Sequence, residues 1–374
     1  GAAFRAAAWA LLFVALAQVY LGATRGLKVM RHTLWIYWAG QPAAWVALML
    51  LAWTVSRTAA AAVLAYTGSW ALATAAAWYA WERETAAFPR VPGERGEVGA
   101  LLRYGAPRAP AALLSQLLFW TDYFVLARFV GERELGVYAA VVRVGQALML
   151  LLVAVNYMFS PFVADLHARG ERQRLDQLYK ALSRWVLAGT VPLLLVLAVL
   201  PGSVLRAFGA GFEEGATALR VVLVGQAVNV AVGGVGFILV MVGRTGWDLV
   251  VYALSFLLDL GVAAALSPLV GMEGAAVAQS LTMVASNLGR LYLVWRFVRI
   301  QPFGRAHRRL LGPTAVGAAV TGLVHALLGG RGWAVDLVGS GAAGVAAYAV
   351  ALLLAGLTPG ERATLRGVLR RVRA

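Results

Sequence analysis

Long apolar runs separated by short polar segments dominate this sequence. Eight runs contain no Asp, Glu, Lys or Arg over at least 19 residues: 6–24, 32–56, 58–81, 144–164, 185–205, 221–243, 310–330 and 337–360. Three more reach that length if one charge is accepted inside them: 109–127 with Asp122, 249–272 with Asp259 and 274–295 with Arg290. About 20 apolar residues cross a bilayer as a helix, and barrel strands would alternate over about ten residues. The pattern therefore predicts an all-α polytopic membrane protein with about 11 transmembrane helices.

Composition supports the membrane class and narrows the chemistry. The chain has 374 residues, of which 61% are hydrophobic and only 13% charged, whereas soluble domains carry about 25% charged residues. It has no cysteine, and its four histidines are scattered over different segments. Thiol catalysis and disulfides are excluded, and no metal-ligand spacing exists. We therefore expect no catalytic residues, no metal site and no enzyme.

The net charge of +16 has a topological explanation. If the loops alternate between the two sides of the membrane, 24 of the 33 lysines and arginines fall on one side: 24–33, 82–108, 164–184, 244–248, 296–309 and 358–374. Seven fall on the other side, and Arg143 and Arg290 lie inside spans. By the positive-inside rule the C-terminus is cytoplasmic and the N-terminus lies outside. A folded basic face of the kind that binds nucleic acid is absent, so we expect no nucleic-acid partner.

The same pattern divides the chain into five parts. Residues 1–81 hold three spans, 82–108 form a cytoplasmic linker containing prolines and glycines, 109–298 hold six spans, 299–357 form a basic loop and an appended two-helix hairpin, and 358–374 form a basic cytoplasmic tail. We expect the tail to lie on anionic membrane lipids. The connector 164–184 has leucines at helical spacing, which predicts an amphipathic helix on the membrane surface.

Two segments resemble a known family. The run DYFVLARFVG at 122–131, followed by LGVYAA at 135–140, resembles the start of the second lobe in polysaccharide flippases. The run LSPLVG at 266–271, followed by GAAVA at 274–278, resembles the same family. These flippases belong to the multidrug, oligosaccharidyl-lipid and polysaccharide exporter superfamily. The order and spacing of the segments extend the resemblance over nearly the whole chain from residue 4.

The resemblance implies a two-lobed exporter fold of 14 helices. Residues 4–81 then match spans four to six, 109–298 match spans seven to twelve and 310–357 match the last two, so the first three helices are lacking here. It also implies a bacterial plasma-membrane transporter, which we expect to be monomeric. Its partner would be a polyprenyl-diphosphate glycan lipid, with undecaprenyl-diphosphate-linked oligosaccharide flipped by alternating access. No cofactor is implied, and coupling to a proton or to sodium stays open.

Other functions compete with this one. A lipid II flippase or a multidrug exporter of the same fold is the nearest alternative, because the embedded charges, two acids and two arginines, do not decide between an anionic lipid and a cationic drug. A membrane glycan polymerase or ligase is a remote alternative. Such enzymes need acid–base groups on a sizeable outer loop, and the predicted outer loops here are short.

Asp122 and Arg143 are the first candidate site residues. Their midpoint falls inside the turn between Gly131 and Gly136, so an antiparallel hairpin places them at equal depth, and Gln146 follows Arg143 on the same helical face. A charge at the centre of a membrane helix costs about 2.5–3.5 kcal/mol on insertion scales. We therefore expect an ion pair, which either fixes the hairpin or exchanges partners when an anionic substrate or a proton binds.

Asp259 is the candidate for proton coupling. It lies about 15 Å into its span, and reflection through the turn at 268–273 places Thr282 opposite it rather than a cation. A buried carboxyl group without a basic partner is costly to ionise, which suits a group that binds and releases a proton. A hydrogen-bonded structural acid, or a partner on another helix, is the alternative.

A polar stripe follows the last span of the second lobe. Gln279, Met283, Ser286 and Arg290 recur at positions i, i+4, i+7 and i+11, and Asn287 borders them. Arg290 would hold a diphosphate through charge-assisted hydrogen bonds, with Asn287 and Gln279 beside it in the cavity. Alternatively, its long side chain extends to the cytoplasmic interface.

Overall fold

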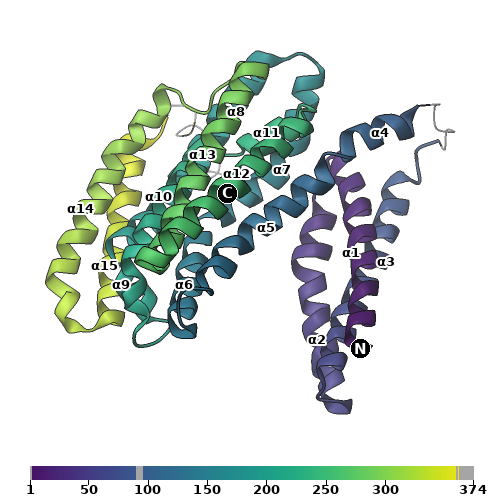
Figure 1. Cartoon of the computed structure of the whole chain (residues 1–374). Coiled ribbons are helices and arrows are strands. Elements are labelled where there is room, and N and C mark those ends of the chain that lie inside the picture. The colour runs from purple at the N-terminus through teal and green to yellow at the C-terminus, as the bar shows by residue number, and fades with distance from the viewer. Residues whose placement is uncertain (1, 90–95, 359–360, 362–374) are drawn as a thin grey trace, which may run out of the picture. The chain divides into compact units, whose positions relative to one another are not determined.

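The computed structural model describes residues 2–89, 96–358 and 361, and it is helical throughout its regular elements (Figure 1). Residues 90–95 of the predicted linker 82–108 therefore lie outside the described residues. The predicted basic tail lies outside them except for Thr358 and Glu361. The chain divides into two compact units, Gly1–Arg95 and Gly96–Ala374.

The first unit consists of three long helices. These are α1 (Ala2–Gly26), α2 (Gln41–Val55), which continues a π-helical turn over Thr33–Gly40, and α3 (Ala59–Thr85). Helix α3 packs against both of the others, with Ala17 of α1 and Trp70 and Ala73 of α3 in its core. Small side chains let these helices approach closely, as is common in membrane bundles. The Thr74 hydroxyl donates to the Phe13 carbonyl oxygen at 2.7 Å and joins α3 to α1.

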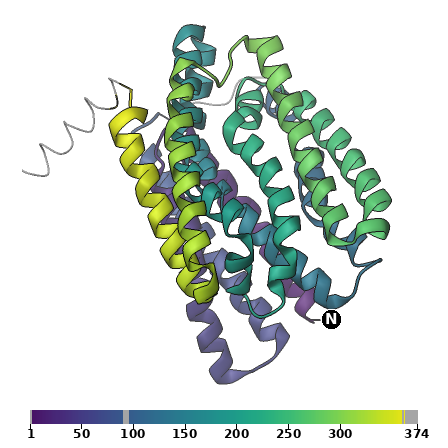
Figure 2. The same ribbon diagram turned by 90° about the vertical axis from the view of Figure 1, so that its left-hand side faces the viewer.

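The second unit is a bundle with an added hairpin (Figure 2). Its helices are α4 (Glu97–Gly105), α5 (Arg108–Leu126), α6 (Glu132–Gln146), α7 (Met149–Ala168), α8 (Arg172–Val199), α9 (Pro201–Arg206), α10 (Ala216–Val232), α11 (Val235–Met241), α12 (Thr245–Val270), α13 (Met272–Val298), α14 (Leu311–Leu328) and α15 (Trp333–Ala351). Short helical turns lie at Phe212–Gly215, Arg305–Leu310, Gly329–Arg331 and Leu352–Gly356. Helices α14 and α15 lie side by side and pack against α8.

Ten helical segments of the described chain are long and apolar enough to cross a membrane. They correspond to ten of the 11 predicted spans. The eleventh, 274–295, lies within α13, which has 27 residues and packs along α12. It is long enough to span a bilayer. The polar residues of its stripe make it less apolar than the ten other segments. The chain is an all-α polytopic membrane protein, and α13 carries the predicted polar stripe.

The connector 164–184 differs from its prediction. Helix α7 continues to Ala168, and α8 begins at Arg172 as part of a helix of 28 residues. Leu175 and Tyr179 on the first turns of α8 are buried in a core with Val298 and Ile300. The expected amphipathic surface helix is therefore wrong, because its apolar face packs against protein.

The turn before α6 contacts the turn before α13. Glu134, from the turn that opens α6, accepts a hydrogen bond from the Met272 backbone N–H at 2.8 Å. Gly271, before Met272, has φ of +59°, a conformation that favours glycine. This contact holds the start of α6 against the start of α13. The glycine and the acidic residue in these turns thus have structural roles.

Candidate functional site

A polar seam lies between α5, α12 and α13 of the second unit. On α12, Asp248, Tyr252, Ser255 and Asp259 recur at i, i+4, i+7 and i+11 and form one face of the helix. On α13, Thr282, Ser286 and Arg290 follow a similar spacing. Helix α12 packs against both α5 and α13, so the two stripes face each other inside protein rather than lipid. Polar groups of these helices gather in two clusters along the seam.

The acidic cluster consists of Asp122 of α5, Tyr138 of α6, Asp259 of α12 and Thr282 of α13. All four are buried, with Asp122 exposed by 2% and Asp259 by 1%. The Asp122 carboxyl group interacts with the Asp259 carboxyl group and with Tyr138, and Asp259 also interacts with Thr282. The predicted position of Thr282 opposite Asp259 thus matches the structure. The partner on another helix is a second acid.

Several oxygen atoms of this cluster lack a well-aligned hydrogen bond. Asp122 Oδ1, Asp259 Oδ2, Tyr138 OH and Thr282 Oγ1 are buried without a partner that meets geometric criteria. Two facing carboxyl groups in a buried site cannot both be ionised unless a positive charge lies between them. The four oxygens can therefore share a proton or coordinate a small monovalent cation. In the described part of the chain, no three His, Cys, Asp or Glu side chains gather as a metal site.

The predicted Asp122–Arg143 ion pair is wrong. Helix α5 ends at Leu126 and α6 begins at Glu132, so the turn is centred earlier than its two glycines indicate, and Asp122 lies beside Tyr138. Arg143 is exposed on α6, and no ion pair of Arg143 occurs among the described residues. It lies 11 residues from the start of α6, about 16 Å along the helix. Gln146, which ends α6, is half-buried.

The arginine cluster lies at the other end of the seam. Arg290 Nε donates to Asp248 Oδ1 at 3.1 Å, and Arg108 Nη1 donates to Asp248 Oδ2 at 2.8 Å. The Arg290 guanidinium also lies over the Tyr252 ring, 4.3 Å from its centroid. Arg290 is 8% exposed, so it does not extend to the interface. One of its nitrogens, Nη2, is buried without a partner, and the cluster has a formal charge of +1.

The other two predicted residues of the stripe, Asn287 and Gln279, do not take part in either cluster. Asn287 Nδ2 donates to the Met283 carbonyl oxygen at 2.9 Å, so this amide is bound within its own helix. Gln279 Oε1 is buried without a partner. The structure thus brings Asp122 to Asp259, and Arg290 to Asp248. It joins neither Asn287 nor Gln279 to the arginine cluster.

Sequence reasoning missed three residues of the seam. Asp248 was placed in a loop, although it completes the stripe through Tyr252 and Asp259 by helical spacing. Arg108 was placed in the linker, but it lies in the first turn of α5. For Tyr138 the sequence has no signal, because its partner depends on where the preceding helix ends.

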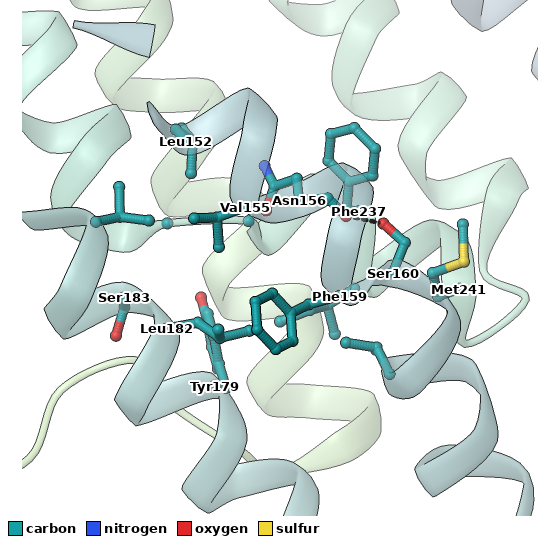
Figure 3. A pocket seen from close by; sticks show the side chains of 15 residues that line it. Leu152, Val155, Asn156, Phe159, Ser160, Tyr179, Leu182, Ser183, Phe237 and Met241 are labelled. Carbon is teal, nitrogen blue, oxygen red and sulfur yellow. Dashed lines mark hydrogen bonds between the residues drawn. The ribbon is translucent and has the colours of Figure 1, made fainter. Parts of the chain in front are cut away.

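A pocket between α7, α8 and α11 is too small for a glycan (Figure 3). Its volume is about 20 Å³, and Asn156, Ser160, Tyr179 and Ser183 contribute its polar side chains. The Tyr179 hydroxyl donates to the Val232 carbonyl oxygen at 2.8 Å, beside the break between α10 and α11. Gly233 in this break has φ of +71°. A space of this size suits one water molecule.

The architecture defines a multi-pass membrane protein of the all-α class. Residues 2–214 match the model of the family described as "Polysaccharide biosynthesis protein". The chain belongs to this family, which confirms the predicted relationship to polysaccharide flippases. No curated protein matches the chain significantly.

Solved structures of exporters share the fold. A MATE structure in the bent conformation aligns with a TM-score of 0.68 at 15% sequence identity, over 79% of this chain and 68% of that chain. The lipid II flippase MurJ in an inward closed conformation aligns with a TM-score of 0.59 at 12% identity, over 91% of this chain and 71% of that chain. These similarities show the two-lobed exporter fold.

Proposed function

We propose that this protein flips an undecaprenyl-diphosphate-linked oligosaccharide across the bacterial plasma membrane by alternating access. The observation that carries the proposal is Arg143, an exposed cation about 16 Å along α6. Helix α6 leads into α7, a candidate membrane span, in a member of a polysaccharide biosynthesis family. Facing lipid, such a side chain would cost several kcal/mol. Facing a water-filled cavity, it has no such cost and attracts an anionic headgroup.

A diphosphate is the chemistry that suits this cation. Arginine presents several N–H donors in a planar fork and binds phosphate oxygens through charge-assisted hydrogen bonds. Gln146 lies three residues further along α6 and offers an amide to the same headgroup. A cationic drug, by contrast, would be repelled by Arg143. The three acids of the second unit's seam, Asp122, Asp248 and Asp259, are buried rather than exposed.

Lipid II is the second candidate substrate. The fold similarity to the flippase named for it covers 91% of this chain, and its polyprenyl diphosphate is the same chemical group that Arg143 would bind. The two candidates differ in the group attached to the diphosphate. A comparison of both glycolipids in one translocation assay therefore separates them.

We further propose that the acidic cluster couples transport to a cation. Asp122 and Asp259 lie on different helices, α5 and α12, and a shared proton or sodium ion between them would hold these helices together. Release of the cation would leave two like charges facing each other and favour separation of the helices. A ligand shifts a conformational equilibrium only by its different affinities for the two states.

The test is translocation of purified glycolipid in proteoliposomes. Arg143→Gln should lower the rate by about tenfold to a hundredfold, because a lost charge-assisted hydrogen bond is worth about 1.5–3 kcal/mol. Arg128→Gln is the matched control, since Arg128 is also exposed but lies in the turn after α5. Equal rates for parent and Arg143→Gln with every polyprenyl-diphosphate glycan would contradict the proposal.

A further inference from the structure

A basic cleft lies at one end of the second unit, between the first turns of α8 and the end of α13. Its volume is about 520 Å³, and its lining residues are Arg172, Gln173, Asp176, Lys180, Trp295, Arg299 and Gln301. Three cations and one acid give it a formal charge of +2. The cleft is separate from the polar seam and from Arg143.

Backbone contacts hold the two walls of the cleft together. Arg172 Nη2 donates to the Arg299 carbonyl oxygen at 2.8 Å, and the Gln301 backbone N–H donates to Asp176 Oδ1 at 3.3 Å. Arg299 has φ of +57°, and its N–H bonds back to the last turn of α13. The segment that follows α13 is thus fixed against α8, and the cleft is preformed.

Several donors in the cleft are available to a ligand. Asp176 neutralises Lys180 through an ion pair at 2.5 Å. The Arg299 side chain is exposed and makes no hydrogen bond or ion pair within the described residues. Arg172 uses one guanidinium N–H on the Arg299 carbonyl and retains others. Two guanidinium groups therefore remain available to an anion with several oxygen atoms.

The position along α13 matches the headgroup region of a membrane. Trp295 lies 23 residues after Met272, which corresponds to about 35 Å of helix, whereas the hydrocarbon core is about 30 Å thick. Tyr292 and Trp295 are exposed, as is usual for aromatic residues at the membrane interface. The cation distribution assigns this end of α13 to the cytoplasmic side.

An apolar stripe connects the cleft with the hydrocarbon region. Leu281, Leu288, Tyr292 and Trp295 are all exposed on α13 and recur at i, i+7, i+11 and i+14. An acyl chain lying along this stripe would bring its own headgroup to the basic cleft. A soluble anion could use the cleft but would gain nothing from the stripe.

We propose that this cleft binds the phosphodiester of an anionic phospholipid in the cytoplasmic leaflet, with Arg299 and Arg172 on its phosphate oxygens and an acyl chain along the stripe on α13. The chemistry shared with other ligands is a phosphate group, and the apolar stripe favours a lipid as its source. The site is independent of the glycan lipid that is transported.

The test uses the whole protein in phosphatidylcholine vesicles that contain phosphatidylglycerol with brominated acyl chains. Quenching of Trp295, taken as the difference between the parent and Trp295→Phe, reports binding. Arg299→Gln should raise the phosphatidylglycerol content needed for half-maximal quenching about fivefold, the effect of one cation at an anionic surface. Arg299→Lys should recover most of the affinity. Because the Arg299 guanidinium has no protein partner, these variants keep the fold.

Arg296→Gln is the matched control, since Arg296 is exposed on the same turn of α13 but does not line the cleft. It should leave the quenching curve unchanged. An equal loss in Arg296→Gln would indicate diffuse surface charge and overturn the proposal, as would an unchanged curve in Arg299→Gln. Displacement of the lipid by inorganic phosphate, or by a polyprenyl diphosphate at equal content, would also overturn it.

Discussion

Asp122 and Asp259 could be recognised from the sequence as candidate functional residues, but their interaction with each other could not be predicted. Each interrupts an otherwise apolar run, which makes it recognisable in the sequence as a candidate for function. The partner of each was harder to predict. Asp122 faces another acid because α5 ends at Leu126, and the position of a helix end within an apolar run leaves little trace in the sequence.

The arginine cluster gives a prediction at the residue scale. Asp248→Asn should destabilise the protein by about 3–5 kcal/mol, because it leaves the buried Arg290 without its counter-charge. Arg290→Gln should cost less, since Asp248 then retains Arg108. Thermal unfolding of the purified variants measures both effects. Equal midpoints for the two variants would contradict the assigned pairing.

Helices in the second unit approach closely where small residues face each other. Gly225 of α10 lies against Ser280 of α13, and a β-carbon built at Gly225 would come within 2.9 Å of the Ser280 Cα. This close approach allows α10 to pack against α13, the helix that carries Thr282 and Arg290. The packing of an inner helix thus positions residues of the polar seam.

Gly225→Ala should therefore separate α10 from α13 and lower stability by about 1–3 kcal/mol, the usual cost of overpacking. Gly261→Ala is the control, because nothing lies within 4 Å of a β-carbon at Gly261 on α12. Thermal unfolding midpoints of both variants provide the measurement. A midpoint for Gly225→Ala that is no lower than that of Gly261→Ala would argue against this contact.

The sequence predicted the elements better than their contacts. Apolar runs located all ten segments that are apolar enough to span, and helical spacing predicted the stripe on α13 that contains the buried Ser286 and Arg290. Reflection through the short turn before α13 correctly placed Thr282 beside Asp259, because two long helices joined by a tight turn keep their register. The same reasoning failed for Asp122, where the turn is longer. It could not find Arg108 or Tyr138, whose positions depend on how α5 and α6 pack.

At the scale of the whole molecule, the cation distribution predicts the orientation in the membrane. A reporter fused after Ala374 should be cytoplasmic, and a reporter in the 206–220 loop should lie outside, because 24 of 33 cations fall on the side of the tail. Paired phosphatase and fluorescent-protein fusions measure this. The reverse result would also move the basic cleft of α8 and α13 to the outer surface.

In the proposed transport cycle, the acidic cluster changes with the conformation of the protein. The fold shared with exporters supplies two lobes, and within the second unit the seam places two acids and a net positive cluster on the same three helices. In the proposed mechanism, a cation bound between Asp122 and Asp259 favours the packed state of α5 and α12. Its release would favour another arrangement, so a gradient of this cation could drive the transport cycle.

Gradient-driven translocation of a polyprenyl-diphosphate glycan in proteoliposomes tests this account most directly. An imposed proton or sodium gradient should accelerate flipping by the parent. Asp259→Asn should abolish that acceleration and preserve glycolipid binding, because the amide cannot release a proton or neutralise a cation. Glu132→Gln, the same charge change at an exposed position in the first turn of α6, should respond like the parent. An Asp259→Asn protein that still responds fully to both gradients would contradict coupling through the acidic cluster.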